Sequence, residues 1–102
     1  MIEPALTHRP SALAQDIAQL ARAIISPNLT VIWFGSWPKG TARPQSDIDI
    51  ALESTETIPL QKMAALREAT DALATLHEID LIDLRSVGDS VRAEILTHGI
   101  LL

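Results

Sequence analysis

The sequence predicts an α/β (α+β) fold in which helices flank a small mixed β-sheet. Three short runs, 30–34, 47–52 and 79–84, are rich in β-branched and other apolar residues, which is typical of strands. Two longer segments, 11–24 and 57–76, repeat apolar residues at helical spacing. Because the chain has 102 residues and no linker divides it, we expect one domain that spans it all.

The first helix is expected after Pro10, with Ser11 as its N-cap. Its apolar stripe advances in steps of four, three and four residues: Leu13, Ile17, Leu20 and Ile24. The sequence Ser-Pro-Asn at 26–28 ends this helix. The strand that follows, TVIWF at 30–34, is apolar on both faces, which predicts a position inside the sheet.

The middle of the chain predicts a turn, a strand, a helix and another strand. Residues 37–46 contain two prolines and a glycine, which favour a short helical turn followed by a loop. The strand DIDIAL at 47–52 alternates acidic and apolar residues, so one of its faces carries carboxylates. A long helix opens at 57–59, and IDLIDL at 79–84 is the third strand. The buried stripe of the long helix is predicted to be Met63, Leu66, Ala69, Leu73 and Leu76.

The C-terminal part predicts a last helix with Asp89 or Ser90 as its cap and Gly99 at its end. Its buried stripe includes Val91 and Ile95. Residues 100–102 are expected to form a short edge strand or to pack as a tail.

Composition excludes several classes of protein. The absence of Cys excludes disulfides and thiolate metal sites and suits a cytoplasmic protein. A net charge of −5 makes DNA an unlikely partner, since phosphate backbones are repelled. No apolar run is long enough to cross a membrane, and the start lacks the pattern of a signal peptide. We expect residues 1–10 to be a loosely ordered N-terminal segment.

Asp47 and Asp49 form the first half of a candidate site. Residues i and i+2 of a strand share a face, and they lie about 6.6 Å apart along it. Two carboxylates at this spacing can converge on cations, and a pair of Mg²⁺ ions held by carboxylates is the usual machinery of nucleotidyl transfer. Ile48, Ile50 and Leu52 assign the opposite face of the strand to the core. We therefore expect two Mg²⁺ ions on the acidic face.

Gly35 and Ser36, at the end of the preceding strand, form the second half. A glycine at a strand-to-helix turn lets a ligand approach the backbone, and the following helix start offers free N–H groups to phosphates. Lys39 and Arg43 are the nearest cations for a triphosphate.

A third acid is expected from the strand 79–84, where Asp80 and Asp83 point to opposite faces. Asp80 lies among apolar residues, where an unpaired carboxylate would be costly to bury. We predict that Asp80 is the third acid and that Asp83, near the strand end, is structural or exposed.

The histidines and tryptophans give weaker signals. His8, His77 and His98 are scattered, with no partner at metal-ligand spacing, and are expected in surface or capping positions. Trp33 is predicted to be core. Trp37 has two open interpretations: it packs structurally, or it lines the site or a partner surface.

Gly35-Ser36, ten residues and Asp47-Ile48-Asp49 together resemble the signature of the DNA polymerase β-like nucleotidyltransferase superfamily. More narrowly, the chain is similar to minimal nucleotidyltransferases of the MNT type over roughly residues 12–102. The stretches that carry this resemblance are WFGSWPKGTARPQSDIDIAL, EIDLIDL and RAEILTHGILL. It implies a nucleotidyltransferase fold, and an acceptor hydroxyl that attacks the α-phosphate of a nucleoside triphosphate.

The resemblance also implies roles for individual residues. Asp47 and Asp49 would hold Mg²⁺, and Asp80 would complete the metal site and help to deprotonate the acceptor. Gly35 and Ser36 would hold the triphosphate. Trp37 stands where relatives commonly have Arg, which leaves the phosphate contacts there to Lys39 and Arg43.

The resemblance implies a partner as well. Minimal nucleotidyltransferases resemble antitoxins that transfer AMP from ATP to a tyrosine of a HEPN ribonuclease toxin. We expect no room for an acceptor-binding domain, and the chain has no Tyr, so such a target must lie in another polypeptide. Two alternatives stay open: an antitoxin that neutralises the toxin by binding alone, and a small-molecule nucleotidyltransferase, of the antibiotic-modifying kind, that a partner subunit completes.

Overall fold

A four-stranded mixed sheet with the strand order β3-β2-β1-β4 forms the centre of the computed structural model, which describes residues 10–102. β1 pairs with β2 and with β4 in antiparallel fashion, whereas β2 and β3 are parallel. The strands are β1 Thr30–Phe34, β2 Ile48–Glu53, β3 Ile79–Asp83 and β4 Ile100–Leu101. This confirms the predicted α+β fold, with residues 100–101 as an edge strand.

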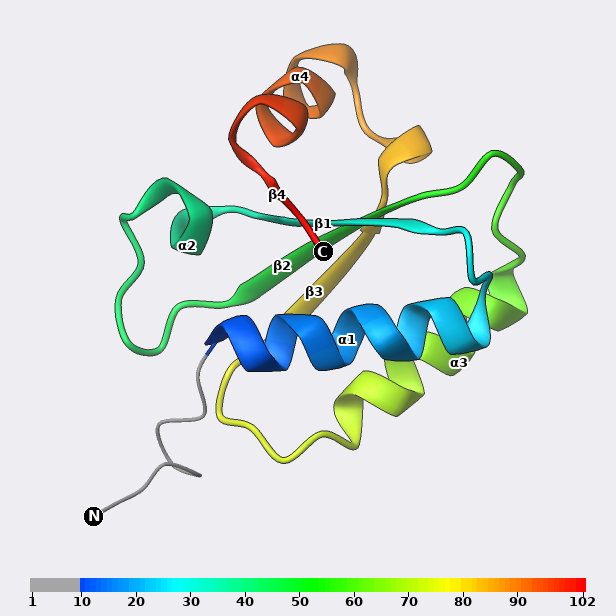
Figure 1. Cartoon of the computed structure of the whole chain (residues 1–102), viewed down its shortest axis with the longest axis horizontal. Helices are drawn as coiled ribbons and strands as arrows, with labels where there is room; N and C mark the ends of the chain where they lie inside the picture. Colours follow the sequence, from blue (N-terminus) through cyan, green and yellow to red (C-terminus); the bar gives the residue numbers. More distant parts are fainter. Residues whose placement is uncertain (1–9) are drawn as a thin grey trace.

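Helices cover both faces of the sheet, as Figure 1 shows. α1 and α3 pack on one face, and α4 lies on the other. The helical segments are α1 Pro10–Ile24, α2 Ser36–Lys39, α3 Leu60–Asp71, the short turn η1 Leu84–Ser86 and α4 Asp89–His98. No helix within residues 10–102 is long and apolar enough to cross a membrane.

The two faces of β2 explain how the sequence places its acidic residues. Ile48, Ile50 and Leu52 are fully buried in the large core beneath α1 and α3, as predicted from the alternation. Ala51 points to the opposite face and packs in a smaller core with Ile95 of α4. Asp49 has the same parity as Ala51, so it lies on the α4 face of the sheet.

β1 contributes to both cores, as its uniformly apolar sequence predicts. Val31 and Trp33 join the large core, and Ile32 joins the small one. Trp33 is 8% exposed, which confirms it as a core residue.

Two predicted helix caps and one predicted buried position are wrong. α1 begins at Pro10, so Ser11 lies inside the helix and is not its cap; the fixed φ of proline suits a first helical position. The N-cap of α4 is Gly88, with no side-chain cap, rather than Asp89 or Ser90. Val91, predicted in the buried stripe of that helix, is half exposed, because α4 covers the sheet mainly through Ile95.

The helix predicted over 57–76 is shorter than expected. α3 ends at Asp71, and Leu76 is 94% exposed instead of buried. The reason is that β3 pairs with β2 in parallel, so the chain after α3 must return to the start of β2. There the Ile48 amide donates to the carbonyl of Glu78 at 2.8 Å. The predicted loose order of residues 1–10 concerns positions outside the described part of the chain, except Pro10.

Candidate active site

Asp49 and Asp80 lie side by side on the α4 face of the sheet. They are register partners across the parallel β2–β3 pair, and register partners point to the same face. Asp49 is half-buried and Asp80 is exposed. Asp80 thus lies beside Asp49 on one face, and its role as the third acid stays a prediction.

Asp83 has a different environment. It is the register partner of Leu52, a residue of the large core, and its carboxylate accepts the Arg85 amide at 3.0 Å at the start of η1. Its carboxylate therefore caps a turn and does not join the acidic face.

Asp47 precedes β2 and is exposed, two positions before Asp49. The pKa of Asp49 is raised above its ordinary value, first because burial disfavours its charge and then because the negative charges of Asp80 and Asp47 repel it. The negative charges of Asp47 and Asp80 therefore both act on the carboxyl group of Asp49. The combined negative charge and oxygen chemistry of the three carboxylates suit a divalent cation.

These carboxylates do not form a complete metal cage. Within residues 10–102, no three acidic or histidine side chains are grouped closely enough to hold a metal ion by themselves. Mg²⁺ is commonly bound through one or two carboxylates together with water and substrate phosphates. The arrangement therefore fits a magnesium site that the nucleotide completes, and the metal-binding role of the three acids stays a prediction.

Gly35 lies directly against the side chain of Asp49. Its φ is +88°, a left-handed conformation that side chains rarely adopt, and a Cβ atom at this position would collide with Oδ2 of Asp49. The carboxylate of Asp49 therefore lies against the backbone of the turn that was predicted to hold phosphates. Ser36 is the first residue of α2 and follows this turn directly.

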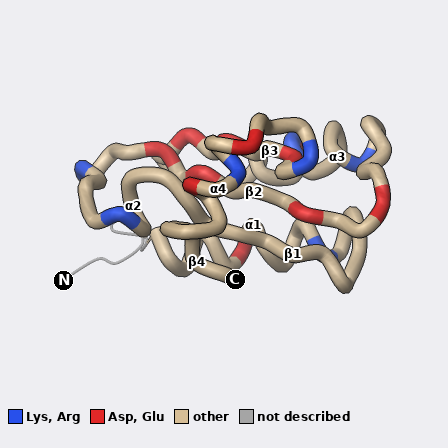
Figure 2. Tube along the Cα trace, turned by 90° about the horizontal axis from the view of Figure 1, so that it is seen from above, with Lys and Arg blue, Asp and Glu red and all other residues tan. Residues whose placement is uncertain are grey.

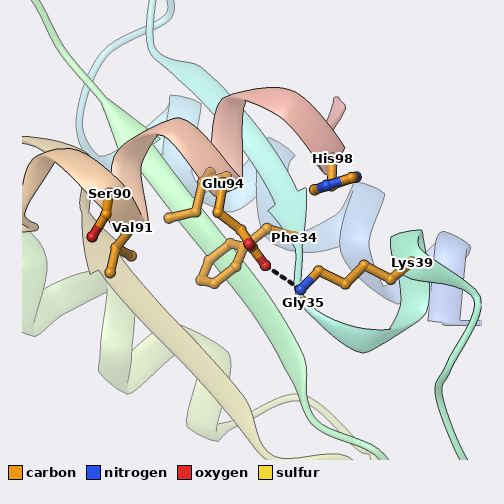
Figure 3. A pocket seen from close by; sticks show the side chains of 8 residues that line it. Phe34, Gly35, Lys39, Ser90, Val91, Glu94 and His98 are labelled. Atoms are coloured by element: carbon orange, nitrogen blue, oxygen red, sulfur yellow. Dashed lines mark hydrogen bonds and ion pairs between the residues drawn. The ribbon is translucent and has the colours of Figure 1, made fainter.

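Lys39 lies across a pocket from α4. The pocket has a volume of about 420 Å³, and Phe34, Gly35, Lys39, Glu94 and His98 are among the residues that line it (Figure 3). Lys39 forms an ion pair with Glu94 across its mouth, and this contact lowers the pKa of Glu94. The pocket thus joins the Gly35 turn to α4.

Arg43, the second predicted cation, is exposed in the loop between α2 and β2. Figure 2 shows basic positions at α2 and along this loop, and acidic positions between the loop and α4. The structure therefore brings Asp49, Asp80, Gly35 and Lys39 to one face of the sheet and leaves Arg43 at its margin.

Comparison with known proteins agrees with this geometry. The family described as "Polymerase beta, Nucleotidyltransferase" matches residues 15–102, most of the chain. The chain belongs to this nucleotidyltransferase family. Its glycine-serine turn and paired acids thus lie within the matched region.

Individual relatives carry more specific names. The protein adenylyltransferase MntA of Shewanella oneidensis is 33% identical over 75 residues, which are 72% of this chain and 52% of MntA. The chain therefore spans about half the length of this curated relative.

Solved structures of toxin–antitoxin complexes are similar as well. A complex with AMP-PNP matches at 32% identity with a TM-score of 0.69, over 86% of this chain and 70% of that one. A complex of the tri-AMPylated Shewanella oneidensis HEPN toxin with its MNT antitoxin matches at 27% identity and a TM-score of 0.67, over 91% and 71% of the two chains.

Trp37 is not among the residues that line the pocket between the Gly35 turn and α4. Its side chain packs against the large core, on the side of α1 and α3, and its ring meets that of His77 edge-on. The structural interpretation of Trp37 is therefore the one that the contacts support. The sequence does not predict that His77 contacts Trp37 and Ser46, because both residues are far from it in the chain.

The raised pKa of Asp49 predicts how the stability of the protein depends on pH. A carboxyl group whose pKa is raised in the folded state destabilises the fold when it is ionised. This destabilisation is complete above the folded-state pKa and is absent below the unfolded-state pKa of about 4. Asp49→Asn removes this effect. Without divalent ions, the variant should melt a few degrees above the wild type at neutral pH, and the difference should shrink as the pH falls through the folded pKa. Thermal unfolding followed by circular dichroism at neutral and acidic pH measures this; a gain that grows in acid would contradict it.

Proposed function

We propose that this nucleotidyltransferase transfers AMP from ATP to a tyrosine hydroxyl of a HEPN ribonuclease toxin and thereby acts as an antitoxin. The observation that carries the proposal is the Asp49–Asp80 pair, whose half-buried member, Asp49, lies against the Gly35 turn. The relatives named MntA and MNT antitoxin, and the AMP-PNP complex, support ATP as the substrate and a HEPN toxin as the partner. Because ATP is the substrate, we place the reaction in the cytoplasm.

The reaction requires an in-line displacement at the α-phosphorus of ATP. The acceptor oxygen forms a bond to this phosphorus, the bond to the bridging oxygen of the β-phosphate breaks, and pyrophosphate leaves. Asp80, exposed beside Asp49, takes the proton of the acceptor hydroxyl and passes it to solvent. Asp47, Asp49 and Asp80 would hold two Mg²⁺ ions, which supply charge stabilisation of the phosphates and the leaving group.

The triphosphate is placed by the turn beside the acids. The absence of a side chain at Gly35 lets the Asp49 carboxylate lie against the turn, so a phosphate bound to the backbone of Gly35 and Ser36 would lie beside this carboxylate. Lys39 lines the same pocket and must exchange its ion pair with Glu94 for the phosphates. Arg43, in the exposed loop between α2 and β2, stays a predicted contact for the distal phosphate oxygens.

The acceptor must come from another molecule if it is a tyrosine, because the sequence contains none. Asp80 is exposed on the acidic face, so a loop of a partner protein can reach its carboxylate. The net charge of −5 disfavours nucleic acid as the acceptor.

The experiment that tests this function combines the purified chain, ATP, Mg²⁺ and a HEPN toxin from the same genome. We expect the intact mass of the toxin to increase by one or more adenylyl groups and its ribonuclease activity to disappear. Asp47→Ala/Asp49→Ala should abolish both effects. A double variant that still neutralises the toxin fully would show that binding alone is the function. Label on a small hydroxylated compound, with none on protein, would favour a small-molecule nucleotidyltransferase.

A further inference from the structure

Two side chains from separate segments meet on the carbonyl oxygen of Ser46, the residue before Asp47. The indole Nε1–H of Trp37 donates to this oxygen at 3.2 Å, and Nδ1 of His77 lies 2.8 Å from it. A carbonyl oxygen can only accept, so Nδ1 of His77 carries the proton in this contact. The two rings also touch each other, with centroids 5.9 Å apart and planes at 81°.

Further hydrogen bonds close the loop around Ser46. Its amide donates to the carbonyl of Arg43 at 2.9 Å, and its hydroxyl accepts the Arg43 amide at 2.7 Å. The amide of His77 donates to the hydroxyl of Thr75 at 3.1 Å, which orders the segment that carries the imidazole. Trp37 and His77 thus connect three segments of chain: α2, the loop before β2 and the loop before β3.

Asp47 depends on these contacts more than the other two acids do. Asp49 and Asp80 lie within strands, where ladder hydrogen bonds fix their backbones. Asp47 lies outside β2, between the anchored carbonyl of Ser46 and the Ile48 amide, which donates to Glu78 at 2.8 Å. The backbone on its N-terminal side is therefore held through Ser46.

We infer that Trp37 and His77 are positioning residues that hold Asp47 in place for metal binding, acting through the carbonyl of Ser46. The inference rests on the proposed role of Asp47 as a magnesium ligand. Neither Trp37 nor His77 is among the residues that line the pocket beside Lys39, and Trp37 packs against the large core. Their loss should therefore weaken metal binding and leave contacts with the nucleotide itself unchanged.

The test uses variants that remove one donor each. Trp37→Phe keeps a ring in the core but removes the indole N–H, and His77→Ala removes the imidazole. His77→Asn is the matched control, because its amide nitrogen lies close to the position of Nδ1 and can donate to Ser46. Outer contacts that orient a metal ligand typically change metal affinity by about tenfold or more when they are removed.

Two measurements are made on each variant. Electron paramagnetic resonance of Mn²⁺ in the presence of AMP-PNP should give a metal affinity about tenfold weaker for Trp37→Phe and His77→Ala, with His77→Asn near the wild type. The {¹H}–¹⁵N heteronuclear NOE of the Asp47 amide, without metal, should fall in the same two variants and recover in His77→Asn. At saturating Mn²⁺, the KM for ATP should be unchanged.

The outcomes separate this inference from the proposed function. If the Asp47 amide stays as rigid as in the wild type and Mn²⁺ affinity is unchanged in both Trp37→Phe and His77→Ala, the positioning role is wrong. If both effects appear but no toxin is adenylylated, the positioning role stands and the proposed acceptor is wrong. A heteronuclear NOE that falls without any change in Mn²⁺ affinity would reduce the contacts to a structural role and overturn the inference.

Discussion

Replacement of Asp49 with asparagine is expected to lower the rate of AMP transfer by about 10³-fold or more, which corresponds to roughly 4 kcal/mol of transition-state stabilisation. Asparagine has nearly the same size, so the contact with the Gly35 turn is kept. What it removes is the negative charge of the half-buried member of the acidic pair. Single-turnover transfer of labelled AMP from ATP to the toxin measures the effect.

Asp83→Asn is the matched control for this variant. It changes the same functional group on a neighbouring strand, but its carboxylate caps η1 and lies opposite Leu52 instead of Asp49. Because asparagine keeps an oxygen that can accept the Arg85 amide, we expect Asp83→Asn to change stability little and to leave the transfer rate unchanged. If Asp49→Asn and Asp83→Asn lowered the transfer rate equally, Asp83 would belong to the site, and its exclusion in favour of Asp80 would be wrong.

Gly35→Ala is expected to damage the fold and the site together. The left-handed backbone at φ +88° is unfavourable for alanine, and the new Cβ would collide with the carboxylate of Asp49. Backbone strain of this kind costs about 1–3 kcal/mol, and displacement of a packed side chain adds to it. We expect urea unfolding to show a free energy of unfolding lower by about 2–4 kcal/mol, together with loss of transfer.

Gly40→Ala separates the two causes. Gly40 also has a positive φ, +79°, but no atom lies within 4 Å of the position that its Cβ would take. The variant should therefore show only the backbone penalty, about 1 kcal/mol, and should retain transfer activity. If Gly40→Ala and Gly35→Ala were equally destabilised and equally active, contact with Asp49 would not explain the glycine at position 35.

The sequence predicts well which face of the sheet each strand side chain occupies, because this depends only on the local alternation of residues. The alternation in DIDIAL places Ile48, Ile50 and Leu52 in the core, and this leaves Asp49 on the opposite face. Opposite parity likewise separates Asp80 from Asp83. Side-chain direction in a strand depends on parity alone, so these predictions need no tertiary information.

Features that depend on distant segments could not be predicted in this way. The ion pair of Lys39 with Glu94 and the contact of His77 with Ser46 join residues far apart in the chain, and no spacing rule relates them. Leu76 continues the apolar period of α3, yet it is exposed, because the pairing of β3 with β2 pulls the chain away from the helix. Strand pairing is a tertiary constraint that overrides local propensity.

The proposed function depends on the binding of divalent cations by Asp47, Asp49 and Asp80 beside the Gly35–Ser36 turn. Electron paramagnetic resonance of Mn²⁺, titrated with AMP-PNP into the wild type, Asp49→Asn and Asp83→Asn, tests it most directly. We expect tight, nucleotide-dependent Mn²⁺ binding in the wild type and in Asp83→Asn, and loss of this binding in Asp49→Asn. Wild-type Mn²⁺ affinity in Asp49→Asn would show that the Asp49 carboxylate does not bind the metal.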